Sequence, residues 1–224
     1  MYWMDAMPVV TAIEVHQRDK ERAKLYLDDE YAIDLPLMQA ARLSPGQQLT
    51  PTEVAELSAA GALQAAFDRA VHFLAYRPRS IEEVRRHLVK KEVPDSHIAA
   101  VIERLLQRGY VDDVEFARYW VANRERFKPM GSRALRYELR QKGVDDEIID
   151  GLLAEVDEEE SAYRAAQART SRYRGFTRQA FRQKLGALLR RRGFSESAIS
   201  DVALRLQAEL ESSDTGYFLS SDDD

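Results

Sequence analysis

From Phe67 onward, apolar residues recur every three to four positions, the spacing of helices that bury one face. This pattern itself recurs along the chain. Residues 84–93 align with 135–144 and again with 185–194, at offsets of 51 and 50 residues. Each segment has two apolar residues four apart, then a base, a Gly or Glu, and a further apolar residue. Such regular offsets predict three copies of one helical unit.

Polar residues indicate where the helices begin and end. Three pairs have capping-box spacing: Ser80 with Glu83, Asp112 with Glu115, and Asp157 with Glu160. Gly143 and Gly193 follow basic turns, where a left-handed residue ends a helix. The helices are expected at 67–76, 80–91 and 95–108 in the first unit, 113–127, 132–142 and 146–155 in the second, and 158–173, 178–192 and 196–211 in the third.

The first fifty residues follow a different pattern. Alternating apolar positions predict strands at 9–16, 22–27 and 31–35, which would form an antiparallel meander. A short helix at 37–43 and another from Thr50 or Thr52 to Gly61 are expected to pack on this sheet, because three strands alone are marginally stable.

The predicted fold is therefore mainly α, with three tandem three-helix repeats preceded by a small β region. Because stacked repeats bury their apolar faces against each other, we expect an elongated, curved monomer. The expected boundaries are 1–62 for the β-rich extension, 63–110, 111–156 and 157–211 for the three repeats, and 212–224 for an acidic, disordered tail.

Charge is sorted along the chain. The net charge is −5, yet residues 161–210 hold 11 basic and 3 acidic residues, a net charge of +8. Residues 145–160 hold nine acids and no base. Local electric fields will therefore matter more than the total charge.

Several classes of chemistry find no support. The chain has no cysteine, its four histidines are scattered, and its ten glycines form no phosphate-binding loop. The acids at 157–160 are explained by the dipole at a helix start. No apolar run approaches the roughly 20 residues of a membrane span, and the N-terminus lacks the pattern of a signal peptide. We expect a cytoplasmic protein that is not an enzyme and has no metal or cofactor.

Basic residues provide the positive signal, because they recur on the middle helix of every repeat. In the second repeat three of them stand three to four residues apart and share one face. Stacked in parallel, the three helices would present an extended basic surface suited to a polyanion or an acidic protein groove. The alternative is a solvated face with internal ion pairs. The candidates are Arg85, Arg86, Lys90, Lys91, Arg133, Arg136, Arg140, Lys142, Arg178, Arg182, Lys184, Arg190, Arg191 and Arg192.

A loop in the second repeat adds three more bases. Pro129 breaks the helix after Lys128, so Arg124, Arg126 and Lys128 are expected to lie at a contact element. The aromatic residues between these bases could stack on nucleobases. Packing in the helix core is the alternative for Trp120.

The order of several short motifs resembles the RecX family of recombinase regulators. The motifs are RPRS at 77–80, GYVDD at 109–113 followed by FAR at 116–118, KPMG at 128–131 and LRYELRQKGV at 135–144. The resemblance covers residues 66–211. It implies a non-enzymatic modulator that binds the groove of a RecA filament, with single-stranded DNA in it, and inhibits its recombinase and ATPase activities.

Glu92 departs from the family, which usually has glycine there, and the third repeat is unusually polar. Two alternatives stay open: a DNA-binding regulator in which a three-helix unit mimics a helix-turn-helix, and a repeat scaffold for an unrelated protein. Bases spread over three units, rather than over one recognition helix, argue against the first alternative.

Overall fold

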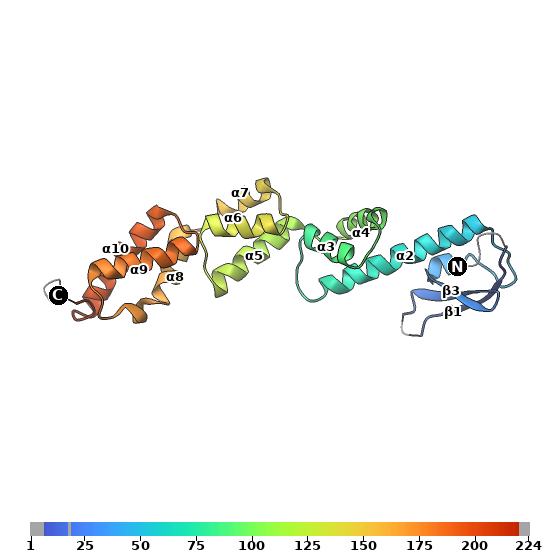
Figure 1. Ribbon diagram of the computed structural model, residues 1–224, viewed down its shortest axis with the longest axis horizontal. Coiled ribbons are helices and arrows are strands. Elements are labelled where there is room, and N and C mark those ends of the chain that lie inside the picture. The colour runs from blue at the N-terminus through green and yellow to red at the C-terminus, as the bar shows by residue number, and fades with distance from the viewer. Residues whose placement is uncertain (1–6, 18, 220–224) are drawn as a thin grey trace. The chain divides into compact units, whose positions relative to one another are not determined.

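The computed structural model describes residues 7–17 and 19–219. The chain divides into two compact units (Figure 1). One comprises residues 1–77 and 84–110, and the other comprises residues 78–83 and 111–224.

The first unit begins with the expected antiparallel meander. Strands β1 (Val10–Val15), β2 (Arg22–Leu27) and β3 (Glu30–Pro36) pair in the order β1-β2-β3. The alternation in β2 places Ala23, Leu25 and Leu27 in the core, each at most 1% exposed. The two residues between β2 and β3 have positive φ, at which the chain reverses direction. This sheet confirms the predicted β region.

Helices cover the sheet, and one of them differs from the expectation. Helix α1 (Leu37–Ala40) is followed by α2 (Pro51–Leu74), which begins with a capping box at Thr50. The predicted break at Gly61 is absent, so the expected boundary at 62/63 falls inside α2. A Cβ at Gly61 would lie 2.9 Å from Ile33 Cγ2 and would strike the Asp34 carbonyl. Glycine therefore lets α2 approach β3 closely and does not end the helix.

The rest of the first unit comes from the first repeat. Helix α3 (Ile81–Lys90) has its first turn in the second unit, and α4 (Asp95–Gln107) follows it. After α3 the chain turns at Glu92, whose φ is 58°. Glu92 thus has the left-handed backbone of its equivalents Gly143 and Gly193, whose φ values are 78° and 82°.

The second unit holds the other two repeats. The second repeat comprises α5 (Asp113–Phe127), α6 (Ser132–Gln141) and α7 (Asp146–Leu153). The third comprises α8 (Glu158–Gln167), the 3-10 turn η1 (Thr170–Tyr173), α9 (Arg178–Arg191) and α10 (Glu196–Ser213). The helices agree with the predicted repeats, except that the helix expected at 158–173 is split into α8 and η1.

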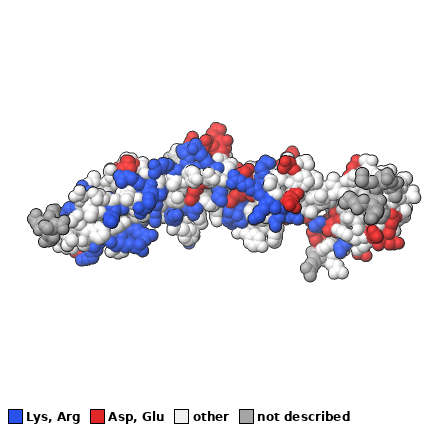
Figure 2. Space-filling model, viewed as in Figure 1, with Lys and Arg blue, Asp and Glu red and all other residues white. Residues whose placement is uncertain are grey.

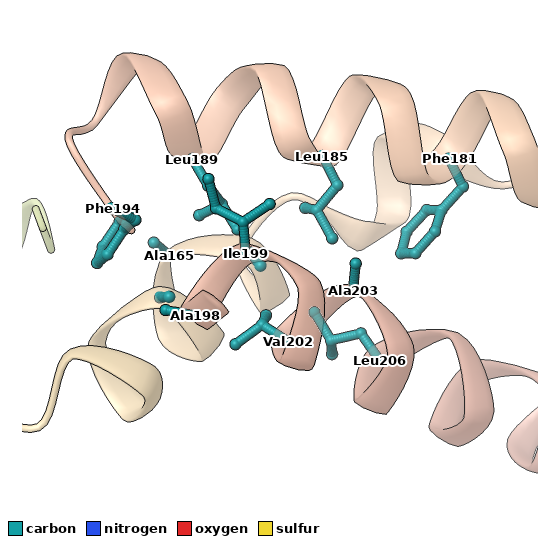
Figure 3. Packing of buried hydrophobic residues seen from close by; sticks show 12 residues of the cluster. Ala165, Phe181, Leu185, Leu189, Phe194, Ala198, Ile199, Val202, Ala203 and Leu206 are labelled. Atoms are coloured by element: carbon teal, nitrogen blue, oxygen red, sulfur yellow. The ribbon is translucent and has the colours of Figure 1, made fainter. Parts of the chain in front are cut away.

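Equivalent positions form the cores of these two repeats. Leu135, Leu139 and Ile149 are fully buried in the second repeat. Their equivalents Leu185, Leu189 and Ile199 are buried in the third, where side chains of α9 point towards those of α10 (Figure 3). The apolar spacing that predicted the repeats is therefore the spacing of their cores.

The end of the chain differs from the predicted disordered tail over residues 212–219. Helix α10 continues to Ser213, and the Tyr217 side chain is 5% exposed. Gly175 N–H donates to Tyr217 O at 2.9 Å, and the Phe218 ring packs edge-on against Phe181 at 5.2 Å. Tyr217 and Phe218, together with the bond from Leu219 N–H to Phe176 O at 3.1 Å, hold this segment on the third repeat. Residues 220–224 lie outside the described part.

Within the described part of the chain, no helix is sufficiently long and apolar to cross a membrane.

Candidate polyanion-binding site

The second and third repeats meet at helix ends, in a contact that we call the second joint. It joins the loop at 128–131, together with the start of α6, to residues 190–193 at the end of α9. Gly131 N–H donates to Arg192 O at 2.9 Å. Gly193 has a φ of 82°, and a Cβ there would lie 2.6 Å from Ala134 N. Both glycines are therefore needed for the close approach of the two repeats.

An equivalent contact, the first joint, lies within the second unit between residues 78–83 and the end of α6. Ser80 Oγ donates to Lys142 O at 2.6 Å. Ser80 aligns with Gly131 and Lys142 with Arg192, so the same two positions are bonded in both joints. A Cβ at Gly143, which aligns with Gly193, would lie 2.6 Å from Glu82 Cγ. The repeats thus share one geometry of contact.

The first joint pairs its charges internally. Lys142 Nζ lies 2.7 Å from Glu83 Oε1, and these side chains are 25% and 12% exposed. Asp113 Oδ1 accepts the Ile81 N–H at 2.9 Å and so satisfies the start of α3. Burial raises the pKa of the Asp113 carboxyl, and the bond from Ile81 opposes that rise. The second joint has the equivalent of the Asp113 bond, because Glu158 Oε1 accepts the Ser132 N–H at 3.0 Å, so the carboxylate that distinguishes the first joint is Glu83.

The second joint is basic. It brings together Lys128, Arg133, Arg190, Arg191 and Arg192 from two repeats, and Figure 2 shows Lys and Arg atoms gathered where α9 meets α6. Within the described residues, the only carboxylate ion-paired to one of these five cations is Glu196, which pairs with Arg190. Arg133 Nη2 instead donates to Arg190 O at 3.1 Å. Four of these cations thus form no ion pair with a described carboxylate, although the bond from Arg190 and the charge of Arg133 both lower the pKa of Glu196.

Arg192 is the most constrained of these cations. Its side chain is half-buried, and Nη1 lies 3.5 Å from Pro129 O. Burial lowers the pKa of its guanidinium, and the positive charge of Arg169 lowers it further. Sequence reasoning missed Arg169. The available signal was its place among Arg172 and Arg174 in a short segment after α8.

The predicted stripe of Arg133, Arg136 and Arg140 divides into two parts in the structure. Arg136 pairs with Asp150, and Arg140 makes a bidentate pair with Asp146 at 2.6 and 3.0 Å. The alternative of internal pairing with the acidic run is therefore what the structure shows for these two arginines.

The Arg140 pair recurs in the third repeat. Arg190 holds Glu196 at 2.7 and 2.8 Å, and both residues lie 50 positions after Arg140 and Asp146. In each pair the hydrogen bond to the carboxylate raises the pKa of the guanidinium. A pair repeated inside each unit joins the middle helix to the third helix, so it has a structural explanation.

Other candidates surround Trp120. Its Nε1 donates to Glu138 at 2.8 Å, and Glu138 also accepts from Arg124 Nε at 2.7 Å. The Arg124 guanidinium and the Lys142 ammonium lie over the indole ring, at 4.6 and 4.8 Å. Packing inside the second unit, rather than base stacking, thus explains Trp120. The Arg126 guanidinium lies 5.0 Å from the exposed Phe127 ring.

The remaining candidates lie away from the second joint or in the first unit. Arg178 pairs with Glu211, and Arg182 bonds to Gln207. Lys184 is exposed on α9. In the first unit, the basic residues of α3 and the turn after it are exposed: Arg85, Arg86, Lys90 and Lys91. A single surface formed by all three repeats stays a prediction.

Across the described ranges, no group of three metal-ligating side chains is placed to hold an ion. The second joint is therefore a site for binding an anion through cationic side chains.

The fold and this site define a helical-repeat protein with a basic contact surface. Family models for the first, second and third three-helix domains of RecX match residues 66–105, 112–153 and 157–202. The chain belongs to the RecX family.

Known members are similar over most of their length. The chain is 32% identical over 208 residues to the regulatory protein RecX of Bacillus subtilis (strain 168), covering 91% of this chain and 79% of that protein. It is 31% identical over 204 residues to that of Bacillus pumilus (strain SAFR-032), covering 89% and 77%. A crystal structure of a regulatory protein RecX matches with a TM-score of 0.72 at 26% identity, covering 88% of this chain and 98% of the other.

Proposed function

We propose that this chain is a non-enzymatic regulator that binds the RecA filament on single-stranded DNA through the second joint and thereby inhibits its recombinase and ATPase activities. RecX proteins are regulators of RecA, and membership of the family supports the choice of partner. The observation that carries the choice of surface is the set of cations at the second joint that form no ion pair with a carboxylate of the described residues: Lys128, Arg133, Arg191 and Arg192.

A nucleoprotein filament offers the anions that this surface lacks. Its DNA carries phosphates, and a protein that neutralises them releases counterions, so binding is favourable at low salt and weakens steeply as salt rises. The second joint is built from backbone hydrogen bonds and close glycine contacts, so its cations are held on a rigid support. Charge reversal there should therefore remove binding without unfolding the protein.

The test is a double reversal, Lys128→Glu with Arg133→Glu. Both side chains are exposed, so the circular-dichroism melt should stay within a few degrees of the wild type. Inhibition of RecA ATPase on single-stranded DNA should be lost, and pull-down on filaments formed with a non-hydrolysable nucleotide should fall at least tenfold, the loss of about two charged contacts.

A matched control carries the same charge change elsewhere. Arg42 and Arg118 are exposed and lie outside the second joint. The variant Arg42→Glu with Arg118→Glu should inhibit RecA like the wild type. Full inhibition by the folded Lys128/Arg133 variant, or equal loss in both variants, would reject the second joint as the contact surface.

A further inference from the structure

Helix α2 packs against β3 and α4 (Figure 1), and two adjoining cavities lie along it. The larger, of about 630 Å³, is bounded by α2, the end of α4, the start of α1 and the residues before β2. The smaller, of about 430 Å³, continues towards the start of α2. Gln39 and Ala60 line both cavities, which therefore form one groove, the α2 groove. All of its lining residues belong to the first unit.

One end of the α2 groove has two arginines from the end of α4. The guanidinium groups of Arg104 and Arg108 lie 4.0 and 5.3 Å from the centre of the same ring, that of Phe67. Arg104 Nη1 also donates to Gln64 Oε1 at 2.8 Å, which fixes its position further. Within the described residues, neither arginine forms an ion pair with a carboxylate. Two cations held against one ring can be bridged by a single carboxylate of a ligand.

Three carboxylates line the same end of the groove, and they restrict the anions that it can take. Asp68 Oδ2 lies 3.5 Å from Arg22 Nη1, and Asp68 Oδ1 accepts from Gln64 at 2.7 Å. Asp19 and Glu21 lie in the segment before β2. A strand of phosphates would be repelled by these three carboxylates, whereas one carboxylate can reach the arginines of α4 alone.

The centre of the α2 groove is apolar. Leu37, Met38 and Leu63 line the larger cavity, and Leu43 and Leu57 line the smaller one. The leucines are half-buried, but Met38 is 76% exposed, so a ligand in the groove would remove most of its surface from water. The centre therefore favours apolar side chains.

The other end of the groove has two carboxylates and one cation, Arg42. Glu53 accepts the Thr50 N–H at 2.7 Å and so caps the start of α2. Glu56 is exposed and forms no ion pair within the described residues. Helix α2 rises about 18 Å between Glu56 and Asp68, a distance that an extended peptide covers in about six residues.

From this order of charges we propose that the α2 groove binds a short peptide segment of a partner protein, with an acidic end, an apolar middle and a basic end. The acidic end lies between Arg104 and Arg108, the apolar side chains cover Met38, and the basic end faces Glu56. The inference goes beyond the proposed function, because that function uses the second joint, which lies in the second unit, whereas the α2 groove belongs to the first.

The first experiment measures the binding of fluorescein-labelled peptides to the full chain by fluorescence anisotropy. The peptide EELALKK has acidic, apolar and basic residues in this order. An extended chain can lie along the groove in either direction, so the reversed peptide KKLALEE is measured too. The control LEKAKEL has the same composition but mixes its charges. We expect the better of the two ordered peptides to bind about tenfold more tightly than the control, and with a Kd below about 1 mM.

A charge swap then tests the acidic end of the peptide. Arg104→Gln with Arg108→Glu should weaken binding of the better ordered peptide about tenfold. The peptide KKLALKK should bind this variant more tightly than it binds the wild type, because the carboxylates then dominate that end of the groove. Lys90→Gln with Lys91→Glu makes the same change of charge elsewhere in the first unit and should bind every peptide like the wild type.

Met38 gives a second variant that leaves the fold intact. Its side chain is exposed, so Met38→Ser should keep the circular-dichroism melt of the wild type and weaken the ordered peptide about tenfold, the loss of one apolar side chain from the contact. Met38→Leu keeps the apolar surface and should bind within about twofold of the wild type.

Four results would overturn the proposal. Equal binding of the ordered and mixed peptides would show that the order of charges is not read, and no binding of either ordered peptide at about 1 mM would show that no such segment is taken. Displacement of the bound peptide by oligothymidylate would show a site for polyanions. Sedimentation of the wild type as a dimer that Met38→Ser dissociates would show that a second copy of this chain covers the groove.

Discussion

The two joints share one pattern of hydrogen bonds and glycine contacts, but they differ in how their charges are paired. In both, the residue that precedes the middle helix of one repeat donates to the carbonyl at the end of the middle helix of the next. In both, a glycine with positive φ lies against the start of that earlier helix. The first joint pairs Lys142 with Glu83, whereas the equivalent residues of the second joint are Arg192 and Ala134, whose side chain has no charge.

This difference distinguishes contacts that both joints share from charges that are found at one joint. Hydrogen bonds and close glycine contacts occur twice, so they belong to the repeat. The bidentate Arg–carboxylate pair also occurs twice, at Arg140 and Arg190. Of the two joints, the second is the one at which described cations form no ion pair with a carboxylate, whereas Lys142 at the first joint is paired with Glu83. A feature that the fold does not require of both copies is the better candidate for function.

The largest expected effect tests the shared geometry. Gly193→Ala should lower the free energy of unfolding by about 3 kcal/mol. The alanine would have to adopt a left-handed backbone conformation, and its methyl group would have to displace Ala134. The atoms that it meets are Ala134 Cβ and N, at 2.5 and 2.6 Å. Urea denaturation followed by circular dichroism measures the change.

Gly175 is a matched control for this substitution. Its φ is 78°, and a Cβ there would meet nothing within 4 Å. Gly175→Ala should therefore lower the free energy of unfolding by about 1 kcal/mol, the strain of a left-handed backbone at alanine alone. Equal losses for the two variants would mean that the close approach at the second joint contributes little.

A smaller effect tests the difference in charge. Lys142→Met should cost about 2 kcal/mol, because it removes the ammonium group beside the Glu83 carboxylate, which is only 12% exposed. Arg192→Met keeps the apolar stem but removes a cation that burial and Arg169 disfavour. It should cost less than about 0.5 kcal/mol.

The comparison of these two variants is decisive, since the positions are equivalent. Both are measured by urea denaturation, and Trp120, which lies 4.8 Å from the Lys142 ammonium, adds a fluorescence signal for the first joint. If Arg192→Met lowered the free energy of unfolding as much as Lys142→Met, the second joint would also have an internal anion.

The repeat was predictable from the sequence because its cause is local. Apolar spacing and capping residues act within one helix, so Leu135, Leu139 and their equivalents could be identified as core. The continuity of α2 was not predictable, because Gly61 reads as a helix end unless one knows that β3 lies against it. Order at Tyr217 likewise depends on distant contacts with Gly175 and Thr170.

The sequence predicted which basic residues could form the candidate site, but not which of them are free of ion pairs. Counting bases identified Lys128, Arg133 and Arg192 but also Arg136 and Arg140, because the sequence does not show which bases meet a carboxylate. Arg136 reaches Asp150 fourteen residues away, across a turn between helices. Arg169 was missed because no helical stripe contains it. Pairing across elements, rather than charge itself, distinguishes the two groups.

The smallest effect concerns the position where the first repeat departs from the other two. Gly143 and Gly193 meet two demands, a positive φ and a close neighbour, whereas Glu92 is exposed and has only the positive φ, 58°. Glu92→Gly should raise the free energy of unfolding by about 1–2 kcal/mol, because it removes the strain of a left-handed backbone at a glutamate. It should also lower that free energy by about 0.4–1 kcal/mol, because glycine gives the unfolded chain more conformations. The net gain should be below about 1 kcal/mol, a rise of a few degrees at most in Tm. Glu92→Ala is the control and should change little, since alanine meets the same strain. A fall in Tm for the glycine variant would show that the Glu92 side chain stabilises the turn by more than its backbone strain costs.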